Sequence, residues 1–213
     1  MQLISVNVSL PKEVQRKRET VLTGIFKESV EGRVLLRKLN LDGDGQGDLT
    51  VHGGVHQAVY VYPFEHYEYW QEKLGRNDLT FGQFGENFTV MGMLEDQIHI
   101  GDIFRIGAAM VQVTQPRVPC YKLALRMQRP QFPKLFMASG RTGFYLRVLQ
   151  EGEVGAGEVI ERIDIDPDPM SIQDVFRLAY IDKDNRMALQ KAVGLRGLSP
   201  GWQSMFEERL AAR

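Results

Sequence analysis

Short runs in which hydrophobic and polar residues alternate occupy most of the chain, and this pattern is typical of β-strands. The spacing becomes helical over residues 64–74, after Pro63, where Tyr67, Trp70 and Leu74 fall on one face and are expected in the core. The sequence therefore predicts a mainly β protein. Strands are expected over residues 2–8, 21–27, 33–39, 58–62, 109–113 and 144–149, with a hairpin within 98–107, a short helix or loop over 129–138, and the last strand signals within 152–163.

The pattern changes again after an acidic, proline-containing linker at residues 164–169. Beyond it only helical spacing occurs, and three short helices are expected to begin near Ser171, Asp184 and Ser199, with both serines as caps. About 45 residues of short helices bury too little surface to be stable alone. We therefore predict two domains, residues 1–163 and 164–213, with the helices packed on the β domain or across a homodimer.

Composition and charge narrow the functional classes. With 43% hydrophobic and 25% charged residues, the 213-residue chain can bury an ordinary core. Its formal net charge of −1 gives no overall field that would attract nucleic acid or a membrane surface. The first residues have the pattern of a strand rather than of a signal peptide, and no hydrophobic run approaches the ~18 residues of a membrane span. We expect a soluble, cytoplasmic protein.

Cys120 is the only cysteine, which excludes an intramolecular disulfide and fits a reducing compartment. Pro116 and Pro119 stiffen the backbone before it, and helical spacing follows. The thiol is therefore expected at a helix N-terminus between Arg117 and Lys122, where the helix end and both cations favour the thiolate. A buried, inert cysteine is the alternative, because lone cysteines are usually buried. The flanking cations and prolines favour a functional thiolate.

Two loops rich in glycine precede residue 58. The first, residues 42–48, lacks the Glu of a calcium loop and the Lys-Ser/Thr of a P-loop, so we interpret it as a tight turn. In the second, His52 and His56 are four residues apart, but Gly53 and Gly54 between them argue against a helical zinc pair. The double glycine instead predicts a close approach of the backbone to a ligand or to another strand.

Glu86 and Asn87 form a further polar pair, between a glycine turn at Gly85 and an expected strand. In this position an asparagine side chain either caps backbone groups or binds a ligand. The local sequence leaves both options open.

The order of these motifs resembles the MOSC family, named for the C-terminal domain of molybdenum cofactor sulfurase, and especially its small bacterial members with a three-helix extension. Tyr121 stands where the family signature often has tryptophan, which is a mild departure. Each motif alone is weak, but six in the family's order are a specific signal. The matching segments are residues 43–48, 51–54, 58–60 with Pro63, 84–87, 100–102 and 115–122.

This resemblance implies a mostly antiparallel β-barrel with a few helices, plus the small three-helix appendage. It also implies a molybdenum cofactor, rather than pyridoxal phosphate, held through the single cysteine. Some family members reduce N-hydroxylated compounds such as hydroxylaminopurine-type base analogues and amidoximes, with electrons that would here come from a separate donor protein. Others are thought to carry sulfur as a cysteine persulfide, and a binding module with a structural cysteine is a third alternative.

Candidate roles follow from the resemblance together with the chemistry of the residues. A thiolate at Cys120 is a soft ligand that suits molybdenum. Arg117 and Lys122 would bind the cofactor phosphate, and the glycine loops would offer backbone N–H groups. Asp44 and Asp48 are expected to order their loop, and the proton donor stays open among His52, His56 and Glu86. The candidate catalytic residues are Cys120, His52 and Glu86, and the candidate cofactor-binding residues are Arg117, Lys122, Asn87, Gly53, Gly54, Gly85 and His56.

Overall fold

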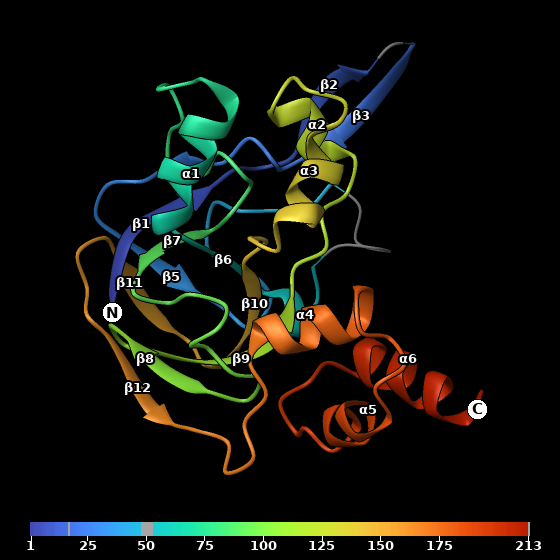
Figure 1. The fold of residues 1–213 in the computed structure, drawn as a ribbon. Coiled ribbons are helices and arrows are strands. Elements are labelled where there is room, and N and C mark those ends of the chain that lie inside the picture. The colour runs from blue at the N-terminus through green and yellow to red at the C-terminus, as the bar shows by residue number, and fades with distance from the viewer. Residues whose placement is uncertain (17, 48–52, 213) are drawn as a thin grey trace.

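The computed structural model describes residues 1–16, 18–47 and 53–212, which form a β-barrel with three helices at its C-terminal end (Figure 1). The strands are β1 (Gln2–Val8), β2 (Lys12–Arg16), β3 (Glu19–Thr23), β4 (Glu28–Ser29), β5 (Arg33–Leu36), β6 (Val59–Pro63), β7 (Phe88–Met91), β8 (Ile103–Ile106), β9 (Ala109–Pro116), β10 (Phe144–Gln150), β11 (Gly152–Gly155) and β12 (Ile160–Asp164).

One eight-stranded sheet makes up the barrel, in the order β12-β8-β9-β10-β6-β7-β1-β4. Its neighbouring strands are antiparallel except β6 and β7, which run parallel. The sheet closes where β1 meets the chain entering β12, because the amide of Leu3 donates to the carbonyl of Glu158 at 2.9 Å and that of Ile160 to Met1 at 3.1 Å. The predicted mainly β, mostly antiparallel barrel is confirmed.

The barrel encloses an aliphatic core that follows from the two-residue period of its strands. Along β9, Ala109, Val111 and Val113 are fully buried, whereas Met110 and Gln112 between them are only partly buried. The neighbouring β10 places Leu146 against the same core. This pairing fixes the end of β9, where the polypeptide leaves the sheet toward Cys120.

The 3-10 helix η1 (Val55–Gln57) precedes β6 and lies against β9 and β10. Three helices cover the upper end of the barrel in Figure 1: α1 (Glu65–Leu74), α2 (Lys122–Arg126) and α3 (Phe132–Ser139). They enclose a second, aromatic core. Tyr67 and Trp70 of α1 are buried there, as the sequence predicts, with Phe84 and Phe136 from other segments, and Leu74 packs at its margin.

The C-terminal helices are α4 (Ile172–Tyr180), α5 (Arg186–Val193) and α6 (Pro200–Ala211). The Ser171 hydroxyl accepts the amide of Asp174 at 3.0 Å, so the predicted cap of α4 is confirmed. Ser199 is the N-cap residue of α6, as predicted, but its side chain forms no capping hydrogen bond. The hydrophobic faces of the helices, including Val175 and Phe206, belong to the same core as the barrel strands. The helices therefore dock on the barrel.

β2 and β3 form a hairpin, of which the sequence predicts only the second strand. The first strand, Lys12–Arg16, was missed because it is exposed and carries only one hydrophobic residue. The strand expected over 21–27 is β3, which ends at Thr23, and the strand expected over 33–39 ends at Leu36. The hairpin projects from the barrel at the upper right of Figure 1. Hydrophobic periodicity does not detect such a strand, since polar and backbone contacts join it to β3, among them the hydrogen bond from Nε2 of Gln15 to the Thr20 hydroxyl at 2.9 Å.

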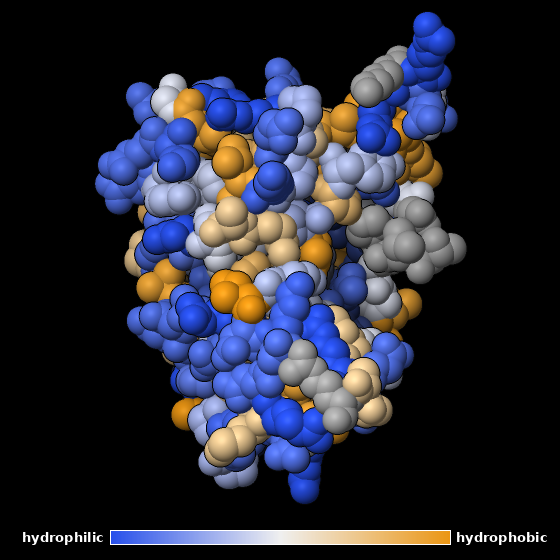
Figure 2. Space-filling model, turned by 45° about the vertical axis from the view of Figure 1, so that its right-hand side comes forward, coloured by the Kyte–Doolittle hydropathy of each residue, from blue (hydrophilic) through white to orange (hydrophobic). Residues whose placement is uncertain are grey.

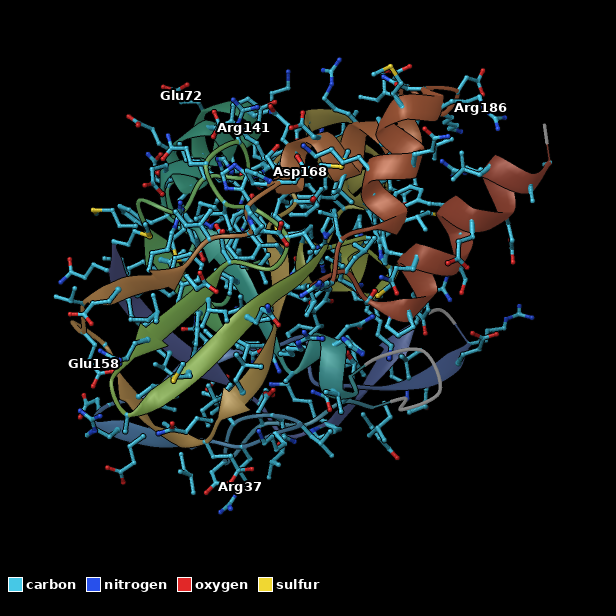
Figure 3. The ribbon with its side chains drawn as sticks, turned by 90° about the horizontal axis from the view of Figure 1, so that it is seen from below. Arg37, Glu72, Arg141, Glu158, Asp168 and Arg186 are labelled. Carbon is cyan, nitrogen blue, oxygen red and sulfur yellow. The ribbon has the colours of Figure 1, made fainter. Side chains whose placement is uncertain are left out.

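The face drawn in Figure 2 is mostly hydrophilic, with hydrophobic residues in separate patches, and the tip of the projecting hairpin is hydrophilic. Seen from below, Arg37 and Glu158 lie at the rim of the barrel and Arg186 at the outer edge of the C-terminal helices (Figure 3). Among the described residues, no helix combines the length and the hydrophobicity that a membrane crossing requires.

Candidate functional site

The segment that carries Cys120 leaves the sheet at the end of β9. The amide of Arg117 still donates to the carbonyl of Gly143 at 3.0 Å, which anchors the segment to the start of β10. Beyond Pro119 the chain turns, and the carbonyl of Cys120 accepts the amide of Leu123 at 3.1 Å. Helix α2 begins at Lys122, two residues later than the thiol, and has only five residues. The predicted helix start is confirmed, but this short helix adds little to the field at Cys120.

A hollow at this segment, here called the cysteine hollow, brings together residues from distant parts of the chain. Six of the predicted site residues line it: Cys120, Arg117, Lys122, Asn87, Gly53 and Gly85. Lys27, Tyr60 and Tyr145 line it as well and were not singled out from the sequence. Three cations, from Lys27, Arg117 and Lys122, therefore surround a space that also contains the only thiol.

Arg117 is held as a buried cation beside Cys120. Only 5% of its surface is exposed, and its guanidinium lies 4.6 Å from the ring centroid of Tyr60 and 5.3 Å from that of Phe136. Burial lowers the pKa of Arg117, but its neighbours Tyr60, Tyr145 and Cys120 raise it, and the balance is a raised pKa. Its Nη1 is buried and has no hydrogen-bond partner among the described residues. This side chain is therefore a fixed charge with an unused donor.

Lys27 and Asp44 form a buried ion pair, of which Lys27 lines the cysteine hollow. Asp44 Oδ1 also accepts the amide of Ser9 at 2.9 Å, and its Oδ2 accepts Nδ2 of Asn87 at 2.9 Å. The Oδ1 atom of Asn87 in turn accepts the amide of Tyr60 at 3.1 Å, so this side chain caps a backbone group within the wall of the hollow. Asp44 orders its loop as expected, whereas Asp48 lies outside the described residues.

Glycines let the backbone walls of the hollow approach closely. At Gly85, which has a φ of 86°, a Cβ atom would lie 2.8 Å from Cγ1 of Ile25. At Gly53, with a φ of 81°, it would lie 3.1 Å from the side-chain oxygen of Gln46. Gly53 thus approaches only a side chain and not another strand, so an approach of the double-glycine loop to a ligand stays a prediction. Gly54 faces open space and is needed for its φ of 86°.

Glu86 does not line the cysteine hollow, although the sequence made it a candidate proton donor. Its carboxylate lies in the aromatic region and accepts hydrogen bonds from the hydroxyls of Tyr67 and Thr89 and the amides of Gly82 and Phe84. Burial raises the pKa of Glu86 above its ordinary value, against the lowering effect of these donors. The fully buried carboxylate of Glu86 thus has four donors, and two of them, the amides of Gly82 and Phe84, belong to the same turn. Glu86 therefore closes the turn at residues 82–86.

The two histidine candidates are placed differently. His56 and Gly54 line a second hollow, between η1 and α6, which also shares Gly53 with the cysteine hollow. Burial, followed by the charge of Arg147, lowers the pKa of His56, so this imidazole is neutral near pH 7. His52 lies outside the described residues.

The donor set of the cysteine hollow fits a molybdenum cofactor. Cys120 offers one soft ligand. The described residues contain no cluster of three or more His, Cys, Asp or Glu, so a metal here would need further ligands from a cofactor. The unused Nη1 of Arg117, with Lys27 and Lys122 nearby, suits a phosphate.

Comparison with known proteins agrees with this geometry. Residues 48–161 match the model of the MOSC domain, and residues 170–213 match the YiiM-like, 3-alpha helix domain. This chain belongs to the MOSC family. It is 39% identical over 207 residues to the uncharacterized protein YflK of Bacillus subtilis, covering 97% of this chain and 93% of YflK.

A solved structure shares the whole architecture of this chain. The crystal structure of YiiM from Geobacillus stearothermophilus superposes with a TM-score of 0.84 at 37% identity, covering 98% of each chain. A reductase of Gibberella moniliformis is 31% identical over 161 residues, which are 74% of this MOSC chain but 28% of the reductase. The family and the three-helix extension that the sequence predicts are therefore confirmed.

Proposed function

We propose that the protein is a molybdenum cofactor-dependent reductase of N-hydroxylated compounds, with Cys120 as the metal ligand. One observation carries the proposal: a thiol shares its hollow with three cations, one of which, Arg117, is buried with an unused donor. An inert, structural cysteine would not require these charges. MOSC membership and the partial match to a fungal reductase support the same chemistry.

Each side chain has a defined part in binding. The Cys120 thiolate would be the protein's ligand, and the adjacent cations favour its charged form. Arg117 would bind the cofactor phosphate through Nη1, held in place by Tyr60 and Phe136. Lys122, which is also buried, would add a second contact to the anion.

Reduction of an N-hydroxyl group to an amine consumes two electrons and two protons and releases water. The bound cofactor would supply the electron transfer at the N–O bond, and a separate donor protein would replenish the electrons. Proton delivery falls to groups at the edge of the cysteine hollow. Of the candidates with a described position, His56 lines the adjoining hollow, which shares Gly53 with the cysteine hollow, whereas the carboxylate of Glu86 is enclosed by its four donors.

The test uses protein expressed in a host that makes the cofactor, assayed with 6-hydroxylaminopurine and a chemical electron donor. Cys120→Ser should abolish reduction with the fold retained, because serine stays protonated near neutral pH and is a poor ligand for a soft metal. Arg117→Ala should lower cofactor retention by roughly ten- to hundredfold, the effect of losing one charge-assisted contact of about 1.5–3 kcal/mol.

Arg141→Ala is the matched control, because Arg141 also stacks on an aromatic ring, that of Tyr69 at 4.3 Å, but does not line the cysteine hollow. It should retain molybdenum and pterin at the level of the unchanged protein. Full activity of Cys120→Ser would refute the thiolate mechanism. Cofactor-loaded protein that reduces no N–O bond, yet carries a persulfide on Cys120, would instead indicate the sulfur-carrier function.

A further inference from the structure

The hollow between η1 and α6, here called the interdomain hollow, has a volume of about 550 Å³, within the ordinary range of small-molecule sites. We propose that it binds the ring of an aromatic N-hydroxylated substrate, so that the C-terminal helices form part of the substrate site. This inference rests on the proposed function, since it assigns the ring-binding part of the same reaction.

The two hollows differ sharply in charge. Three cations line the cysteine hollow, whereas the described lining of the interdomain hollow contains no Lys, Arg, Asp or Glu. Its walls are instead hydrophobic and aromatic, with Trp202 and Met205 from α6, Tyr180 from α4 and Val118 from the cysteine segment. The cations of the cysteine hollow favour a cofactor that carries a phosphate, and the aromatic walls of the interdomain hollow favour a neutral, flat ring.

The polar groups of the interdomain hollow suit a nitrogen heterocycle. Gln57, Gln115 and His56 line it, and amide side chains offer both donors and acceptors. His56 is neutral near pH 7, so it too can donate from one ring nitrogen and accept at the other. Uncharged groups of this kind match the mixed donors and acceptors along the edge of a purine-like ring.

The hollows adjoin, so one molecule can extend from one into the other. Gly53 and Gln57 line both. Between them runs the cysteine segment, which presents Arg117 and Cys120 to one hollow and Gln115 and Val118 to the other. A substituent on the edge of a ring bound in the interdomain hollow would thus point toward the cysteine hollow.

Gly201 allows a test that preserves the fold. It lies in α6, lines the interdomain hollow, and a Cβ atom there would meet nothing within 4 Å. Gly201→Leu should therefore fill the hollow without strain and even favour the helix, while Gly201→Ala adds only one methyl group. Both variants should fold as the unchanged protein does.

The first measurement titrates cofactor-free protein with 6-hydroxylaminopurine, adenine or hydroxyurea and records tryptophan fluorescence. Trp202 lines the hollow and Trp70 is buried in the aromatic core, so Trp202→Phe identifies which of the two responds. Both purines should change the emission and hydroxyurea, which has no ring, should not. Gly201→Leu should weaken purine binding at least about tenfold and Gly201→Ala less than about twofold.

The second measurement uses loaded enzyme. Gly201→Leu should raise the KM for 6-hydroxylaminopurine at least about tenfold, leave that for hydroxyurea within about twofold, and leave the molybdenum and pterin content unchanged. Absence of purine binding to the cofactor-free protein, or equal binding by Gly201→Leu, would overturn the inference. Lost pterin in Gly201→Leu would also overturn it, because the hollow would then hold the cofactor. If loaded protein reduces no N–O bond, the proposed function fails while the binding result still decides the ring site.

Discussion

Two buried carboxylates lie near Asn87 and have opposite surroundings. Asp44 is paired with the ammonium group of Lys27, which lines the cysteine hollow, while Glu86 lies in the aromatic region and has four uncharged donors. The first is half of a charged pair whose lysine lines the cysteine hollow, and the second closes a turn. The comparison shows that burial of an acidic side chain does not by itself indicate catalysis, and that its partners decide its role.

Asp44→Asn should give the largest effect on stability. It leaves the Lys27 ammonium buried without its counter-charge, which costs about 3–5 kcal/mol. Urea denaturation should show this loss, and the double variant Lys27→Met/Asp44→Asn should recover a large part of it, since no buried charge then remains. Equal stability of the single and double variants would show that the pair does not act as a charge pair.

Glu86→Gln should have a smaller effect, about 1–3 kcal/mol, because the amide keeps one acceptor oxygen for four donors. The alkylation rate of Cys120 should stay unchanged, since Glu86 does not line the cysteine hollow. Thermal unfolding and iodoacetamide labelling on the same samples check both expectations. A specific loss of reductase activity in the folded variant would restore Glu86 as a proton donor.

The pH dependence of the Glu86 contribution should be the smallest effect. The pKa of Glu86 is raised by burial, so above about pH 4.3 the folded protein binds more protons at this site than the unfolded chain does. Its contribution to the free energy of unfolding is therefore greatest in acid and decreases as the pH rises toward the folded-state pKa. The stability difference between the unchanged protein and Glu86→Gln, measured from pH 4 upward, should fall with pH. A rising difference would mean that the donors outweigh burial.

Most of the fold could be predicted because its strands and helices bury periodic hydrophobic faces, as along β9 and α1. Arg117, Cys120 and Lys122 could be expected together because they are close in sequence, and all three line the cysteine hollow, while their roles stay predictions. Lys27 was missed because its role depends on Asp44, 17 residues away, and nothing local marks it. The sequence did not show that Glu86 lies outside the lining of the cysteine hollow, because a loop sequence does not say which way its side chains face, and its role as a proton donor stays a prediction.

The exposed stretch at residues 164–169 connects two parts that share one hydrophobic core. Backbone hydrogen bonds also cross between them, from Ile172 to Ile98 at 2.9 Å and from Ser199 to Thr114 at 3.2 Å. Cutting the peptide chain in this stretch would therefore remove the connection without removing the contacts. The two fragments should stay together as a nicked protein, and the helices would form the wall of the interdomain hollow as a non-covalent subunit.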